Sequence, residues 1–433
     1  MTELRRSIGL GQATALVAGT IIGASIFVQP SEIARLVPSV TGVILVWVVA
    51  GLLTLFGAFA CAELASAFPR TGGVYVFLKE TYSPAVGFLW GWAMFWSIHS
   101  GIIAAIAVVF ARYVGYFTPL SDAQIRLVAI GVILVLSAVN YFGVKHGGRL
   151  QLLFTLVKVL AIAVILLLAV LFGSSGGPAP GVAATHEISI SAFAQAVAAG
   201  LFAFGGWHMV TYTAEETRNP KRTIPRGLLL GTLTVTACYI ALNTAYFYAL
   251  PLEKVIASTR VAADAAEAVL GGRGGAIISG LVIFSTFGAV NGIILAGPRV
   301  YFAMARDRLL FQWIAAVHPR FQTPHRAIVL QALWASVLVA TGTYRSLFTR
   351  VIYTEWIFFG LMALGLFLQR RQPHYVPTFQ AWGYPVLPVL FILSSVLIVA
   401  NQVVADPLNS TLGLGLVALG LPVYYLWPQK FAI

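Results

Sequence analysis

The sequence predicts an all-α integral membrane protein with about twelve transmembrane helices. Of the 433 residues, 59% are hydrophobic and only 9% are charged, whereas a soluble domain holds about 25% charged residues. The charges gather in short clusters, and the apolar stretches between them exceed the roughly 20 residues that a spanning helix needs. The first of these stretches is too long for a cleaved signal peptide and many more follow it, so we expect a retained first helix.

Apolar runs place the spans in order along the chain. We expect them near residues 10–33, 41–66, 84–111, 125–144, 149–173, 191–213, 227–250, 275–303, 327–344, 348–369, 385–404 and 409–428. The tenth is the weakest, because Arg350 and Glu355 lie within or beside it. The longest loops, near 174–189 and 251–274, carry no recognisable motif and are assigned no chemistry.

The net charge of +13 is explained by topology rather than by a nucleic-acid partner. If the amino terminus lies inside, most of the 27 Lys and Arg residues fall in inner segments, which predicts cytoplasmic termini in a cell membrane. Cys61 and Cys238 both fall within spans, so neither a disulfide framework nor a zinc site is indicated. We find no metal cluster, nucleotide loop or nucleophile beside a base, and therefore expect neither an enzyme nor a cofactor.

Two spans contain glycine-rich interruptions at mid-depth, in segments 18–27 and 200–208. Glycine in membrane helices often serves close packing instead. The two interruptions, however, lie at corresponding places five helices apart. Because five is odd, a repeat of spans 1–5 in spans 6–10 must be inverted in the membrane, and inverted repeats with paired broken helices are typical of secondary transporters.

Broken backbone at bilayer depth leaves amide and carbonyl groups that a zwitterionic solute can satisfy. The N–H groups expected to receive its carboxylate lie near Gly23, Ala24 and Ser25. The carbonyls expected to receive its ammonium lie near Thr20, Ile21, Phe202 and Ala203.

The motifs at the two interruptions carry a family resemblance. Residues 22–27 read Ile-Gly-Ala-Ser-Ile-Phe and residues 202–207 read Phe-Ala-Phe-Gly-Gly-Trp. Three further blocks lie within 62–75, 215–226 and 285–307. Over nearly its whole length the sequence resembles the amino acid, polyamine and organocation transporter superfamily (APC), and within it the L-type amino acid transporters (LAT) and their bacterial relatives.

The resemblance implies a LeuT-like, five-plus-five inverted-repeat fold that works by alternating access. It divides the chain into a first repeat at 1–173, a second repeat at 174–369 and two extra helices at 370–433. It implies a substrate between the first and sixth helices, with Phe202 as an aromatic gate. Ser25 replaces the second signature glycine and His208 stands where L-type members usually carry Asn, so these are the positions where side-chain selectivity would change.

Further expectations concern the pocket and the partners. Ala24, Phe202 and Gly205 suggest a compact pocket for small or medium neutral amino acids, and His208 and Asn291 are possible additional site residues. Heteromeric animal members carry a cysteine in the outer loop after the third helix. The corresponding loop, 116–122, has none, so we expect a stand-alone prokaryotic carrier without a heavy subunit.

Lys158 lies roughly mid-way along the fifth span, so its ammonium must find carbonyls within the membrane. We expect it to face the broken first helix. In similar members a lysine here takes the place of a sodium ion, which implies sodium independence. A structural lysine that lines an inner cavity is the alternative, and a proton-exchanging role for Lys158 is a further hypothesis.

The remaining membrane-edge charges have simpler interpretations. Glu63 is expected to be structural, and Glu355 to pair with Arg350. Charges within 215–226 and 299–308 form either an inner gate or an ordinary positive-inside anchor. Two other functions stay open: a cationic amino acid or polyamine carrier of the same superfamily, and a channel or receptor with twelve spans. The sequence does not decide between exchange, proton symport and uniport, nor the oligomeric state.

Overall fold

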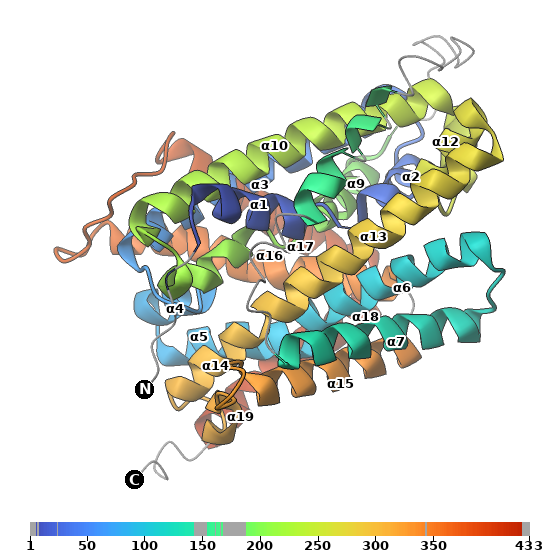
Figure 1. Cartoon of the computed structure of the whole chain (residues 1–433). Coiled ribbons are helices and arrows are strands. Elements are labelled where there is room, and N and C mark those ends of the chain that lie inside the picture. The colour runs from blue at the N-terminus through green and yellow to red at the C-terminus, as the bar shows by residue number, and fades with distance from the viewer. Residues whose placement is uncertain are drawn as a thin grey trace.

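The computed structural model describes residues 6, 8–23, 25–142, 154–160, 162–164, 166–167, 188–342 and 344–426. Within these ranges the regular elements are helices, and the only β-type pairing is an isolated parallel bridge between Ile8 and Thr217. Figure 1 shows long helices that lie side by side in one body.

The first half of the chain contains helices of very different length. They are α1 (Leu10–Ile21), η1 (Ser25–Phe27), α2 (Gln29–Leu36), α3 (Val40–Ala67), α4 (Val74–Thr81), α5 (Pro84–Ala93), η2 (Met94–Ile98), α6 (His99–Phe117) and α7 (Asp122–Tyr141). Residues 154–160 form a further helical segment.

The second half begins with a second interrupted element. Its helices are α9 (Ile190–Ala203), η3 (Trp207–Glu216), α10 (Pro220–Ala249), α11 (Leu252–Ala257), α12 (Val261–Leu270), α13 (Gly272–Ala296), α14 (Pro298–Arg306), η4 (Gln312–Ala315), α15 (His325–Thr341), α16 (Tyr344–Gln369), α17 (Val386–Ala405), α18 (Pro407–Ala418) and α19 (Gly420–Leu426).

Among the described residues, seven helices are long and apolar enough to cross a membrane. Three of them are compound: α5, η2 and α6 are contiguous, α13 and α14 are separated by Gly297, and α9 and η3 are separated by residues 204–206. Leu127 on α7 and Val396 and Leu397 on α17 are at least 60% exposed, as side chains that face lipid would be. The chain is therefore a multi-pass membrane protein.

Helix starts follow from the local sequence. Ser39, Ser121 and Ser189 each accept a hydrogen bond from a backbone N–H in the first turn, at α3, α7 and α9 respectively. Such capping satisfies donors that a helix leaves unpaired. Helix α3 has 28 residues and is therefore about 42 Å long, which is enough to cross the hydrocarbon core. It carries no charge before Glu63, near its end.

The packing of the long helices has a regular pattern. α3 lies along α10, α1 packs against η3 and α10, α6 packs against α13, and α7 packs against α15. In Figure 1, α10, α3 and α1 lie together along one side, while α6, α7 and α15 lie along the other.

The structure differs from expectation at the segment 251–274, which the sequence treats as a loop. It forms α11 and α12, and α12 packs against α13. Six of the ten residues of α12 are alanine or leucine, and both are strong helix formers. The tenth span, expected to be the weakest, is the continuous helix α16 of 26 residues.

Candidate functional site

The first interruption separates α1 from η1. Helix α1 ends at Ile21, and Ile22 has a non-helical ψ of 83°. The Gly23 N–H donates to the Ile21 carbonyl at 2.6 Å, which turns the chain out of the helix. A three-residue 3-10 turn at Ser25–Phe27 then leads into α2.

The second interruption separates α9 from η3. Gly206 has a φ of 92°, which lies in the left-handed region, where glycine alone is free of steric cost. The Gly205 N–H donates to the Phe202 carbonyl at 3.0 Å and closes the last turn of α9. The element that follows, Trp207–Glu216, is a 3-10 helix, and Thr213 has non-helical angles within it.

The two interruptions touch each other. A Cβ added at Gly206 would lie 3.2 Å from Thr20 Cβ, which is tighter than ordinary van der Waals contact. The Thr20 hydroxyl, which donates within α1 to Leu16 O at 2.7 Å, also lies 3.1 Å from Gly206 O. The broken segments thus form one continuous patch of non-helical backbone.

Tyr239 on α10 joins both breaks with one hydroxyl. Its oxygen lies 2.9 Å from Ile21 O and 3.0 Å from Ala203 O, so one proton is shared between the last carbonyls of α1 and α9. Tyr239 is fully buried and its ring packs against Trp47 and Phe204. Its position against both helices was not predicted.

Lys158 reaches the first break as expected. Its Nζ donates to Gly19 O at 2.9 Å, and the residue is 1% exposed. Thr155, one turn earlier, donates to Ala15 O at 3.0 Å. The helical segment 154–160 is therefore fixed against α1 by two polar contacts, one of which carries a charge.

The other expected site residues fall into three groups. Ser25, Phe202 and Ala203 are buried at the breaks, while Ala24 lies outside the described residues. Asn291 on α13 accepts a hydrogen bond from Asn140 Nδ2 of α7 at 2.8 Å, so that carbonyl oxygen is engaged between two helices.

Several backbone groups that were expected to be free already have one partner. The Gly23 N–H is bound to Ile21 O, and the Phe202 carbonyl accepts from Gly205. The carbonyls of Ile21 and Ala203 share the Tyr239 proton. Since a carbonyl oxygen has two lone pairs, each retains one acceptor site. The breaks are thus held in place by internal bonds rather than left open.

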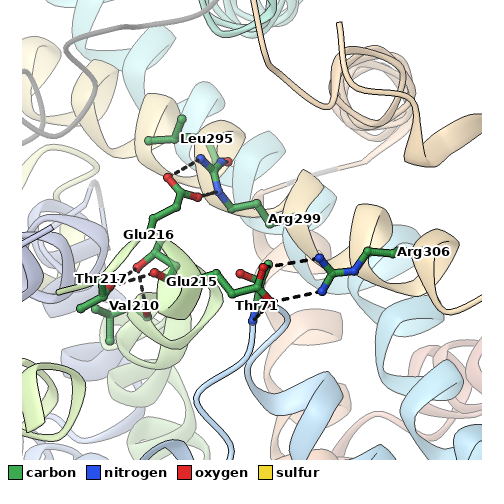
Figure 2. A network of polar contacts seen from close by, with 9 residues as sticks. Thr71, Val210, Glu215, Glu216, Thr217, Leu295, Arg299 and Arg306 are labelled. Atoms are coloured by element: carbon green, nitrogen blue, oxygen red, sulfur yellow. Dashed lines mark hydrogen bonds and ion pairs between the residues drawn. The ribbon is translucent and has the colours of Figure 1, made fainter. Parts of the chain in front are cut away.

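A charge network ties the end of η3 to α14 and to the loop before α4 (Figure 2). Arg299 binds Glu216 through Nε at 2.8 Å and Nη2 at 3.4 Å. Arg306 binds Glu215 at 3.1 Å, and the Thr71 N–H donates to the same carboxylate at 3.2 Å. We call Thr71, Glu215, Glu216, Arg299 and Arg306 the gate network.

Asp307 extends this face toward α4. It accepts 2.6 Å hydrogen bonds from Lys79 Nζ and from the Tyr75 hydroxyl. Burial raises the pKa of Asp307, but the bonds from Lys79 and Tyr75 outweigh burial, so the pKa lies below its ordinary value of 3.8. The carboxylate is therefore ionised at neutral pH.

Glu63 has the structural role expected of it. It is fully buried and accepts from Arg370 Nη2 at 2.6 Å and Nε at 2.8 Å, and from the Ala381 N–H at 2.6 Å. The pair joins the end of α3 to the segment that follows α16.

Glu355 has a neighbour that was not expected from the sequence. Its Oε1 lies 3.8 Å from His208 Nδ1, and both residues are buried. The sequence predicted an ion pair with Arg350, whose side chain lies outside the described part. That prediction overlooked His208, which the break in the sixth span turns toward α16.

Comparison with known proteins decides the family. The profile of the family described as "Amino acid permease" matches residues 8–419. The chain belongs to the amino acid permease family. It is 33% identical to the serine/threonine exchanger SteT of Bacillus subtilis, over 98% of this chain and 97% of that protein.

Two animal relatives also match nearly the whole permease. The human b(0,+)-type amino acid transporter 1 is 30% identical over 100% of this chain and 91% of its own. The large neutral amino acids transporter small subunit 2 of Oryctolagus cuniculus is 31% identical over 99% of this chain and 82% of its own. These relatives are transporters and not enzymes, and amino acid transport is the activity of the permease.

Gly206 and Tyr239 are the parts of the site that residue patterns did not single out. Gly206 is the second of two adjacent glycines, and only its positive φ distinguishes it from Gly205. Tyr239 lies in a long apolar helix, and no motif in that helix indicates that its hydroxyl meets two broken helices.

Proposed function

We propose that the permease is a sodium-independent secondary carrier that moves small or medium neutral L-amino acids across the cell membrane, by exchange or proton-linked uptake. The observation that carries the proposal is the contact between the two interruptions, where Gly206 meets Thr20. Non-helical backbone at this depth needs polar partners, and the charged ends of a zwitterion match them.

The substrate class follows from the charges near the breaks. A cationic substrate needs an acidic group beside the ammonium or guanidinium it carries. In the described part of the chain, Glu355 is a carboxylate close to the second break, 3.8 Å from His208. Neutral amino acids need no such group. The relatives named above, which include a serine/threonine exchanger and a large neutral amino acid transporter, fit this class.

Sodium independence is supported by Lys158. Its ammonium already donates to Gly19 O at 2.9 Å, so a positive charge is built into the place beside the first break. A second cation at the same carbonyl would be repelled.

The packing pattern supports the inverted repeat and alternating access. The contacts α1 with η3, α3 with α10, α6 with α13 and α7 with α15 join four of the five expected spans of the first repeat to the span five positions later. A two-fold axis in the membrane plane would generate such pairs. We assign the repeats to 1–173 and 174–369, with 370–433 as an addition.

The gate network supports a state that is closed on one side. It links η3, which carries half of the site, to α14 at the end of α13. With both termini in the cytoplasm this side is the inner one, and Phe202 would cover the substrate as an aromatic gate. The absence of cysteine from 116–122 supports a carrier that works without a disulfide-linked heavy subunit.

The test is transport in proteoliposomes. Vesicles loaded with L-threonine should accumulate labelled L-threonine by saturable exchange that is unchanged when choline replaces sodium. Unlabelled L-leucine should compete more strongly than L-arginine. Flux that does not saturate would instead favour a channel, and strong competition by L-arginine would favour the cationic carrier.

A matched pair of variants tests the gate. Phe202→Ala should slow exchange while the protein still inserts into the membrane. Phe193→Ala, on the same helix but half-buried away from the break, should leave exchange unchanged. Equal transport by Phe202→Ala and wild type for every amino acid in the panel would show that the gate assignment is wrong.

A further inference from the structure

A second polar site lies behind the broken sixth helix. His208 follows Gly206 by two residues and is fully buried, and Glu355 on α16 is 4% exposed. Among the described residues, neither ring nitrogen of His208 has a hydrogen-bond partner. Glu355 Oε1 has no such partner there either. Their separation of 3.8 Å is too long for a direct bond.

The surroundings of this pair are almost entirely aromatic. The His208 ring packs against Trp90, Trp207, Tyr212 and Phe359 at centroid distances of 4.9–5.7 Å. The titratable side chains around the pair include His99 on α6, which interacts with His208, and Tyr212 on η3, which packs against His208 and interacts with Glu355. Cys61 on α3 and Tyr301 on α14 interact with Tyr212 in turn. In the described part, no Lys or Arg side chain forms an ion pair with Glu355.

Charge arithmetic limits what such a pair can do. With one added proton, shared between the carboxyl and the imidazole, the pair has no net charge. Without it, the pair carries a charge of −1 in an apolar, aromatic enclosure, which is strongly disfavoured. The enclosed form therefore holds the proton, and the pair can release it only when water reaches the site.

The pair is also connected to the substrate site. The Gly206 carbonyl contacts Thr20 of the first broken helix, and Trp207 and His208 follow directly. On the opposite side, η2 (Met94–Ile98) is a π-helical turn next to His99 and α16. π-Helical turns inside membrane helices are frequent at functional sites. A movement of the break would thus move His208 relative to Glu355.

We propose that the His208–Glu355 pair is a proton-binding site, which takes up one proton from water when the broken sixth helix closes over the substrate. This deepens the proposed function, on which its transport consequence rests. It assigns proton linkage to a pair that is separate from Lys158, whose ammonium donates to Gly19 O of α1. Closure, and with it the transport rate, then increases with acidity.

Infrared titration tests the site without any substrate. Purified protein in lipid should show the carbonyl stretch of a protonated carboxylic acid at neutral pH, where exposed carboxyl groups are ionised. Glu355→Gln should remove this band. Glu253→Gln, which changes an exposed carboxylate on α11, should leave it. A band that is absent from wild type, or unchanged in Glu355→Gln, would overturn the proposal.

Labelled L-threonine exchange in proteoliposomes tests the consequence. Where one proton limits closure, the wild-type rate should increase with acidity, by at most about tenfold per pH unit, over the pH range in which the water-accessible form of the pair is unprotonated. Glu355→Gln mimics the protonated carboxyl and should remove this dependence, while Glu253→Gln should retain it. The same pH profile in wild type and Glu355→Gln would contradict the inference. Absence of exchange by wild type would instead count against the proposed function, and the infrared result would still decide the proton site.

Discussion

The gate network provides the sharpest prediction about the transport cycle. Glu216 and Arg299 form a forked ion pair, with side chains 19% and 17% exposed. Replacing Glu216 with Gln removes the charge but keeps the shape. We expect the face between η3 and α14 to open more often, because the ion pair stabilises only the closed form of this face.

The magnitude follows from the geometry. A hydrogen bond to a charged group contributes about 1.5–3 kcal/mol when buried, and solvent screening reduces this to about 1–2 kcal/mol at the exposure seen here. A change of that size shifts the ratio of open to closed forms by about 5–30-fold. Arg70 and Glu80 form a control pair on the same face, 50% and 32% exposed, so Glu80→Gln should cost at most about 1 kcal/mol.

The assay measures the distance between two exposed positions on either side of the network. Arg218→Cys and Gln312→Cys provide sites for spin labels in a Cys238→Ala background, since Cys61 is buried. Pulsed electron resonance then gives the open and closed populations. A double-mutant cycle with Glu216→Gln and Arg299→Gln should yield a coupling of about 1–2 kcal/mol. A coupling near zero, or an equal effect of Glu80→Gln, would refute the reasoning.

Four further predictions concern the same contacts. Glu63→Ala leaves Arg370 without its buried partner and should cost about 3–5 kcal/mol, seen as a lower midpoint of thermal unfolding in detergent; an unchanged midpoint would contradict the structural role. Tyr239→Phe leaves the carbonyls of Ile21 and Ala203 without their shared donor, which destabilises the breaks by about 1–3 kcal/mol. It should slow exchange about fivefold or more. The control Tyr248→Phe changes an exposed tyrosine on the same helix and should leave the exchange rate unchanged. Gly206→Ala would place a Cβ on backbone with positive φ and in tight contact with Thr20, and should abolish exchange. Gly280→Ala adds a Cβ with no atom within 4 Å and should leave exchange unchanged. Equal exchange activity of the two variants would refute the role of the close approach. The pKa of Asp307 lies below its ordinary value of 3.8, so its bond to Lys79 is lost only as the pH falls through that lowered value. Asp307 therefore stays ionised between about pH 5 and 8, and Asp307→Asn should leave the shape of the pH–exchange-rate profile in that range unchanged. A flattened profile would assign the transport-linked proton to Asp307 instead.

The sequence predicted the helical membrane class and both interruptions, because these depend on local composition. Runs without charge identify spans, and glycine clusters identify weak points within them. It also predicted that Lys158 faces the first helix, since a buried ammonium has few other partners, and the 2.9 Å bond to Gly19 O confirms this.

Contacts between distant segments were harder to predict. Nothing local distinguishes Tyr239 from other tyrosines in apolar helices, and its role depends on where α10 crosses α1 and α9. Arg350 was predicted to pair with Glu355 because the two are close in sequence, and this stays a prediction because the Arg350 side chain lies outside the described part. The contact with His208, which comes from another span, could not be predicted in this way. The state of the backbone groups at the breaks also depends on such long-range contacts.

The most direct test of the zwitterion site removes one charged end of the solute at a time. The best exchanged amino acid of the panel should be compared with its carboxamide, which lacks the carboxylate, and its N-acetyl derivative, which lacks the ammonium. If the remaining hydrogen-bonding capacity of the peptide groups at both breaks holds the two ends, each derivative should compete at least about tenfold more weakly, since a loss of 1.4 kcal/mol is tenfold in affinity. Competition by either derivative as strong as that of the parent amino acid would contradict the account.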